Sequence, residues 1–166
     1  MTEYCGQITL FVVPFTKIQE AIRDNCPSAL FTLIMRRLMM EIAQRIAQNY
    51  GFSALVTGES IGQVASQTMA AMVTTDAVCK IPVFRPCIGL DKKEIIDVSY
   101  KIGTFDISIE PYEDCCTVFT PKHPKTQPTL EEVQKAQQSF DFEPYIEEAM
   151  GGIEFKTYKP YAEYDF

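Results

Sequence analysis

The sequence has no run rich in lysine and arginine, no apolar stretch of membrane-spanning length, and a single histidine. The first absence, together with a formal net charge of -7 at pH 7, argues weakly against nucleic acid as a direct partner. The second argues against a membrane protein. The N-terminal residues also lack the basic and apolar segments of a secretory signal. We therefore expect a globular domain, and 166 residues are enough for one domain with a hydrophobic core.

Six cysteines are present, but none form a C-x-x-C pair, and no His-x-x-x-His motif accompanies them. We therefore expect neither a structural zinc site nor a disulfide framework. Four of the cysteines are interpreted as small buried hydrophobic residues: Cys5, Cys26, Cys79 and Cys87.

Apolar strands alternate with helical segments through the first two thirds of the chain. Residues 7–15, QITLFVVPF, are predicted to form a strand that is buried on both faces and ends at Pro14. The further expected elements are a short helix after Thr16, a long helix from Pro27 and Ser28 to about Tyr50 closed by Gly51, a strand at 53–58, a helix from Ile61 to about Val73, a strand at 81–89, and a helix at 91–103 ended by Gly103. This order predicts an α/β fold with a parallel sheet and crossover helices.

The character of the sequence changes after Thr104. Residues 108–129 contain four prolines and are typical of irregular structure. Two short helices are expected within residues 129–149, and a strand is expected at IEFKTY, residues 153–158. The sequence contains no internal repeat and no low-complexity tract.

The stretch VTGESIGQVASQT joins the second expected strand to the next helix. In open parallel sheets, ligands bind at the carboxyl ends of the strands, where Gly58 lies. Ser60 and Gln63 have the spacing of a capping box that starts the helix. A tight turn is enough to explain Gly58. For Gln67, spacing alone favours a solvated helix face over a ligand contact.

The long helix carries arginines on two faces. One face is polar, and its members are Arg37, Glu41, Gln44, Arg45 and Gln48. Arg37 and Glu41 have the spacing of an i, i+4 ion pair. Arg36 instead lies at the flank of the apolar stripe beside small side chains, so it has room to reach an anion such as phosphate. An Arg36 that extends to water is about equally consistent with the sequence.

Cys115 and Cys116 are adjacent in the proline-rich segment, and adjacent cysteines seldom join to each other without strain. An exposed thiolate is a nucleophile or a sulfur carrier. The two acidic residues before the pair oppose thiolate formation, whereas Lys122, His123 and Lys125 favour it if the loop folds back. For the two cysteines the functional and the structural interpretations are close. His123 is better explained as a surface loop residue.

Three segments together resemble the tRNA 4-thiouridine synthetase family, also called ThiI: ALVTGESIGQVASQT, PVFRPCIGLDKKEIIDVSYKIGT and PYEDCCTVFTPKHPKT. The segments YCGQITLFVVPFT and LFTLIMRRLMMEIAQRIA are similar to those that precede them in that family. The resemblance covers nearly the whole chain in the same order. It implies an α/β fold with a Rossmann-like parallel sheet of the PP-loop (adenine nucleotide alpha hydrolase-like) type, truncated at its N-terminal strands.

The resemblance also implies a cytoplasmic tRNA sulfurtransferase. Members of the family adenylate the C4 oxygen of a tRNA uridine with ATP and Mg2+, and a persulfide sulfur supplied by a cysteine desulfurase then displaces AMP. The product is 4-thiouridine, and the family is also linked to thiamine thiazole biosynthesis. By position, Arg36, Gly58 and Gln67 match the ATP-contacting residues of the family. Cys115 matches its essential cysteine, which Cys116 could assist.

The sequence departs from the family pattern in two important respects. The Ser-Gly-Gly-x-Asp-Ser phosphate loop is absent, as are the ferredoxin-like and THUMP parts that capture tRNA. Residues 1–112 are expected to be a partial ATP pyrophosphatase domain, and residues 113–166 a cysteine-bearing loop and helical extension packed on it. We expect weak tRNA binding and no RNA adenylation by this chain alone.

The family sheet order, which resembles 3-2-1-4-5, has a further consequence. It would leave residues 7–15 without a neighbour and the strand at 53–58 with an exposed apolar edge. Unpaired edges invite association, so we expect a homo-oligomer or poor solubility.

Three other interpretations stay open. The chain could be a non-catalytic module that binds a cysteine desulfurase or accepts its sulfur without ATP chemistry. It could be another PP-loop enzyme, although the cysteine segment favours the thiolating branch. It could also be a parallel-sheet domain without a ligand.

Overall fold

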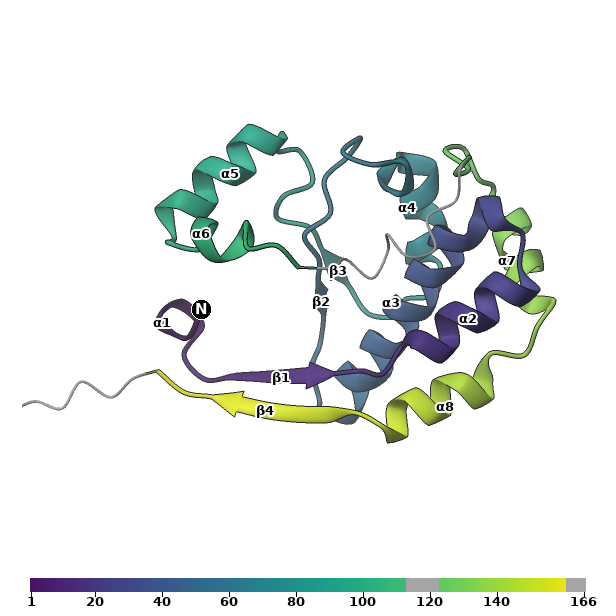
Figure 1. The fold of residues 1–166 in the computed structure, drawn as a ribbon, viewed down its shortest axis with the longest axis horizontal. Helices are drawn as coiled ribbons and strands as arrows, with labels where there is room; N and C mark the ends of the chain where they lie inside the picture. Colours follow the sequence, from purple (N-terminus) through teal and green to yellow (C-terminus); the bar gives the residue numbers. More distant parts are fainter. Residues whose placement is uncertain (113–122, 161–166) are drawn as a thin grey trace, which may run out of the picture.

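The computed structural model describes residues 1–112 and 123–160 (Figure 1). The elements are α1 (Thr2–Cys5), β1 (Ile8–Val12), α2 (Thr16–Asn25), the 3-10 helix η1 (Ser28–Leu30), α3 (Phe31–Asn49), β2 (Leu55–Val56), the 3-10 helix η2 (Ala65–Gln67), α4 (Met69–Asp76), β3 (Val83–Phe84), α5 (Lys92–Lys101), α6 (Phe105–Ser108), α7 (Leu130–Gln138), α8 (Glu143–Gly151) and β4 (Glu154–Tyr158). Within the described ranges, no helix combines the length and the apolar character needed to cross a bilayer.

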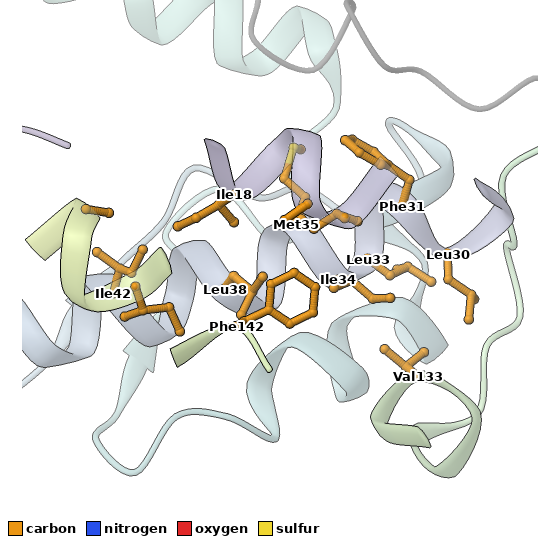
Figure 2. Close-up of a cluster of buried hydrophobic side chains, with 14 of the residues drawn as sticks. Ile18, Leu30, Phe31, Leu33, Ile34, Met35, Leu38, Ile42, Val133 and Phe142 are labelled. Atoms are coloured by element: carbon orange, nitrogen blue, oxygen red, sulfur yellow. The ribbon is translucent and has the colours of Figure 1, made fainter. Parts of the chain in front are cut away.

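The hydrophobic core is built around α3, with α2, α4, α7 and α8 around it (Figure 1). Apolar residues recur along α3 every three or four positions, which gives the helix one continuous buried stripe: Phe31, Ile34, Met35, Leu38 and Ile42. Figure 2 shows this stripe beside Ile18 of α2, Val133 of α7 and Phe142 at the start of α8. The core is therefore mainly a contact between helices.

The four strands of the described residues form two separate pairs. β2 and β3 are parallel, and β1 and β4 are antiparallel. The predicted strand at 153–158 is confirmed as β4. β4 supplies the neighbour that residues 7–15 were expected to lack. The prediction that residues 7–15 form a strand buried on both faces is wrong, because Leu10 and Val12 are exposed on the β1–β4 ribbon.

An apolar cavity of about 400 Å³ lies between the two strand pairs. Its walls include Phe11 and Val13 from the β1 segment, Ile42 and Ile46 from α3, and Leu55 from β2. α3 thus forms a common wall for strands that do not pair with each other.

Most helix ends lie where the sequence predicts them. α3 ends just before Gly51, which has a φ of +74°, and α5 ends just before Gly103, which has a φ of +65°. α5 begins with a capping box in which Asp91 and Glu94 each bond the other's backbone N–H. The helices expected after Thr16 and within residues 129–149 are also present as α2, α7 and α8.

The polar face predicted for α3 does not face water throughout. Arg37 is 4% exposed; its Nε donates to Oε1 of Gln137 in α7 at 2.6 Å, and its Nη1 donates to the backbone oxygen of Thr74 in α4. Glu41 pairs with Arg45 at 2.7 Å rather than with Arg37. Helical periodicity cannot separate a solvated side chain from one that satisfies a buried carbonyl, so the burial of Arg37 was not predictable.

The prediction that four cysteines are buried is wrong. Cys5 is exposed, and Cys26, Cys79 and Cys87 are only partly buried; all four are free thiols. Burial raises the pKa of Cys26. Burial, and then the charge of Asp76, raises the pKa of Cys79. Both shifts favour the protonated thiol over the nucleophilic thiolate.

Candidate functional site

The two parallel strands end side by side, and the residues that follow them form a charged cluster. The backbone N–H of Thr57 donates to the oxygen of Phe84 at 3.0 Å, so pairing continues to the ends of both strands. Gly58 and Glu59 then follow β2, and Arg85 follows β3. This edge is where open parallel sheets bind ligands.

Glu59 is 4% exposed and accepts hydrogen bonds from three side chains. Its Oε2 accepts from Nε of Arg85 at 2.7 Å and from the hydroxyl of Thr57 at 2.9 Å. Its Oε1 accepts from Nη2 of Arg36. Burial opposes ionisation, but the hydrogen bond from Arg85 and the charge of Arg36 outweigh it and hold the pKa of Glu59 below its ordinary value. Glu59 is therefore a buried but fully paired carboxylate.

Arg85 links this carboxylate to α4. Its Nη2 donates to Oδ1 of Asp76, the last residue of that helix. Burial opposes the charge of Arg85, but the bonds to Asp76 and Glu59 raise its pKa. A line of alternating charges therefore runs from Asp76 through Arg85 and Glu59 to Arg36.

Arg36 reaches from α3 to the strand ends. Its side chain is 24% exposed, and its Nη2 contacts Glu59. Its Nε is buried and has no hydrogen-bond partner in residues 1–112 and 123–160. An unmet buried donor costs about 1–3 kcal/mol, so an acceptor brought by a ligand would be favourable here. The guanidinium lies at the strand ends, as contact with an anion requires.

The fold does not require a glycine at position 58. Its φ lies outside the left-handed region, and a Cβ placed on it would meet no atom within 4 Å. Gly62, in contrast, has a φ of +77°, and a Cβ on Gly152 would lie 2.8 Å from Cγ of Pro14. The tight-turn explanation for Gly58 is therefore wrong. The open space beside it allows a ligand to approach the backbone closely.

Gln67 closes the loop that follows β2. Its Oε1 accepts from the backbone N–H of Ser60 at 3.3 Å, and its backbone oxygen accepts from the N–H of Gly62 at 3.0 Å. It is partly buried in η2, so the expectation of a solvated helix face is wrong. Through these two bonds, Gln67 shapes the loop that contains Gly58.

The predicted helix at 61–73 begins later than expected. α4 starts at Met69, after Thr68, whose hydroxyl oxygen accepts from the N–H of Ala71 at 3.2 Å. Ser60 is not a helix cap, because its hydroxyl donates to the oxygen of Leu90 at 2.6 Å. The predicted capping box of Ser60 and Gln63 is therefore wrong. The polar composition of this stretch belongs to a loop that is held by tertiary bonds.

Cys115 and Cys116 lie outside the described residues, so their predicted roles stay predictions. Further along the chain, the backbone oxygen of Thr126 accepts from the hydroxyl of Thr68, the residue after Gln67, at 2.7 Å. His123 is exposed, as expected for a surface residue.

The part of the chain that the structure describes contains no group of three His, Cys, Asp or Glu side chains that could hold a metal ion. Mg2+ is usually bound through one or two carboxylates and the phosphates of a nucleotide. Both carboxylates of the cluster, Glu59 and Asp76, are already paired with arginines. The described residues thus fit an anionic ligand, through Arg36 and the space beside Gly58, better than a metal ion.

Sequence reasoning did not identify Glu59, Arg85 or Asp76. The available signal was position, because Glu59 and Arg85 directly follow two predicted parallel strands. No such signal marked Asp76, whose contact depends on where the end of α4 lies in the fold.

The family model described as "Thiamine biosynthesis protein (ThiI)" matches residues 1–142. Three relatives named "Probable tRNA sulfurtransferase" are similar over most of the chain. The protein of Acetivibrio thermocellus is 53% identical over 157 residues, which are 95% of this chain and 40% of the relative. That of Caldanaerobacter subterraneus subsp. tengcongensis is 53% identical over 147 residues, 89% of this chain and 39% of the relative. That of Lachnospira eligens is 55% identical over 141 residues, 85% of this chain and 36% of the relative.

A solved structure is also similar, the "Crystal structure of a 4-thiouridine synthetase - RNA complex with bound ATP". It is 37% identical with a TM-score of 0.86, and the match covers 92% of this chain and 40% of that chain. The expected α/β fold class is thereby confirmed, together with the parallel pairing of β2 and β3. The chain spans about 40% of the length of the relatives it matches. It belongs to the ThiI family, whose model matches residues 1–142.

Proposed function

We propose that this chain forms part of the nucleotide-binding domain of an ATP-dependent tRNA sulfurtransferase that converts a tRNA uridine to 4-thiouridine. One observation carries the proposal: the arginine-lined, open corner at the ends of β2 and β3, in a fold that matches a 4-thiouridine synthetase with bound ATP. The family description also supports a link to thiamine biosynthesis.

Arg36, Gly58 and Gln67 are proposed to hold the adenine nucleotide. Arg36 offers guanidinium donors at the strand ends, including the unpartnered Nε. Gly58 leaves open space for close approach, and Gln67 keeps the loop beside it in shape. When bound, ATP supplies the group that activates the uridine oxygen for replacement. The task of these residues is to bind and orient the phosphates and to offset their charge.

Cys115 is proposed as the sulfur-carrying residue, with Cys116 assisting. A cysteine desulfurase would transfer the outer sulfur of its own cysteine persulfide to the Cys115 thiolate. The terminal sulfur on Cys115 would attack C4 and displace AMP, and a second thiol would then form a disulfide with Cys115 and leave the sulfur on the uridine. tRNA and the desulfurase are thus the proposed partners, and Mg2+ is proposed to enter with the nucleotide.

The nucleotide part of the proposal is tested by titrating the purified chain with AMP and with ATP in a calorimeter. We expect saturable binding that Arg36→Ala weakens by about tenfold or more, since a charge-assisted contact contributes about 1.5–3 kcal/mol. Arg45→Ala is the matched control, because Arg45 also extends from α3 but pairs with Glu41 and Glu143. If the unaltered chain binds neither nucleotide, or Arg36→Ala binds as well as Arg45→Ala, this part is wrong.

A second candidate is a module that accepts sulfur on Cys115, or binds a cysteine desulfurase, without ATP chemistry. Incubation with a desulfurase, radiolabelled cysteine, ATP and tRNA separates the candidates. Label that stays on Cys115, without release of pyrophosphate, supports the module, whereas label that reaches tRNA supports the enzyme.

A further inference from the structure

We infer that Glu59 is a positioning residue for the nucleotide-binding arginine: it holds the Arg36 guanidinium at the strand ends and is itself anchored by Arg85 and Thr57. The inference rests on the proposed function, because it assigns Arg36 to the nucleotide. It adds residues to the site for which sequence spacing gave no role.

The contacts of the two carboxylate oxygens carry the inference. Oε1 of Glu59 accepts from Arg36, and Oε2 accepts from Arg85 at 2.7 Å and Thr57 at 2.9 Å. One oxygen is therefore anchored at the strand ends, and the other holds the arginine that comes from α3. An arginine side chain loses about 2 kcal/mol of rotamer entropy when it is fixed, and Glu59 fixes Arg36 before any ligand arrives.

An ion pair that serves stability alone explains this arrangement poorly. Buried ion pairs contribute little net stability, and apolar residues of similar size often replace them without loss. Here Nε of Arg36 is left buried without an acceptor in the described residues, and open space lies beside Gly58. A held guanidinium with an unused donor, next to an open corner, is the arrangement that a binding site requires.

The charge of Glu59 lets the inference be tested by the direction in which anion affinity changes on substitution. Glu59 is negative and lies beside the proposed anion site, so simple electrostatics predicts that its neutralisation strengthens anion binding. Positioning predicts the opposite result. In Glu59→Gln, one carboxylate oxygen becomes an NH2 group that faces an arginine donor, so one of the two arginine contacts is lost.

The experiment measures AMP affinity by calorimetry in the unaltered chain, Glu59→Gln, Arg36→Ala and the double variant. We expect Glu59→Gln to weaken AMP binding by about tenfold, within the usual range for coupled neighbours. In the Arg36→Ala background, Glu59→Gln should have no further effect, because its action passes through Arg36. Additive effects in the double variant would overturn the inference.

The matched control is Glu143→Gln. Glu143 also holds an arginine of α3, with its Oε2 2.7 Å from Nη2 of Arg45, but it belongs to α8 and does not contact Arg36 or Arg85. We expect AMP affinity to be unchanged in this control, and thermal unfolding of each variant to separate lost stability from lost binding.

The possible failures can be told apart. If Glu59→Gln binds AMP as well as the unaltered chain, or better, the positioning role is wrong and the proposed nucleotide site stands. If the unaltered chain does not bind AMP, the proposed function fails first and the inference fails with it. If Glu59→Gln does not fold, Thr57→Val removes one anchor of Glu59 without a change of charge; it should weaken AMP binding in the same direction, and an unchanged affinity would overturn the inference.

Discussion

At the scale of the residue, Glu59 shows how burial and pairing act on one carboxylate in opposite directions. Burial raises its pKa, and the hydrogen bond from Arg85, the charge of Arg36 and the hydroxyl of Thr57 lower it by more. Folding therefore favours the ionised form of the Glu59 carboxyl over its protonated form. Glu59 thus contributes stability above the ordinary carboxyl pKa, and this contribution disappears as pH falls through the lower pKa of the folded state.

Glu59→Gln is expected to make stability less dependent on acid pH. The variant should lose about 1–3 kcal/mol at neutral pH, because a partly buried arginine loses a hydrogen-bond partner. It should lose less relative to the unaltered chain below the ordinary carboxyl pKa of about 4.3, where the glutamate contribution fades. Urea unfolding at several pH values from neutral to strongly acidic checks this. A constant difference between the two proteins over the whole range would contradict the assignment of the shift to Glu59.

Gly58 and Gly62 are expected to respond differently to substitution by alanine. Gly62→Ala should lose about 1 kcal/mol or more, because its φ is +77° and alanine is strained there. Gly58→Ala should stay within about 0.5 kcal/mol of the unaltered chain, since its Cβ would meet no atom within 4 Å. Its AMP affinity should nevertheless fall, because the added methyl group enters the proposed ligand space. Thermal unfolding and calorimetry on the same samples check both parts, and a large loss of stability in Gly58→Ala would mean that the fold itself requires this glycine.

At the scale of the element, the sequence predicts most where one local signal acts alone. The glycines predicted to end α3 and α5, Gly51 and Gly103, each have no competitor, and the helix ends agree with them. At the start of α4, Ser60 and Thr68 are both possible helix caps. The hydroxyl of Ser60 instead donates to the backbone oxygen of Leu90, 30 residues away, and Thr68 caps the helix. The candidate site divides in the same way. Family resemblance proposed Arg36 and Gly58, whereas the Arg85–Asp76 contact can be identified only from the tertiary structure.

Because Thr68 caps α4, we expect substitutions at Thr68 and at Gln63 to change the stability of the chain by different amounts. Thr68→Ala should destabilise the chain by about 1 kcal/mol or somewhat more, because it removes the α4 cap and the bond to Thr126. Gln63→Ala, at an exposed loop position, should change stability by less than about 0.5 kcal/mol. Urea unfolding of both variants measures the difference. Equal losses would restore the capping box that the structure rejects.

At the scale of the whole molecule, the helices provide the core and the strands are left with few neighbours. The cavity of about 400 Å³ between β1 and β2 has an almost wholly apolar lining. Val56 at the end of β2 and Phe84 at the end of β3 are both exposed. The relatives are about two and a half times as long as this chain, since it spans 40% of their length. In a short two-stranded parallel pair, both the strand edges and the apolar side chains stay open to other chains.

The exposed strands predict that the purified chain associates with itself, which keeps the expectation of oligomers open to test. Light scattering over a range of concentrations should show a mass that rises above that of one chain. Val56→Lys should shift this mass toward the monomer, because a charge on an edge strand opposes pairing with another strand. Ile107→Lys is the control, since Ile107 is equally apolar and exposed but lies in α6, away from the strands. A monodisperse monomer at all concentrations would contradict the prediction. Equal effects of the two lysines would assign the association to general surface hydrophobicity instead of the strand edge.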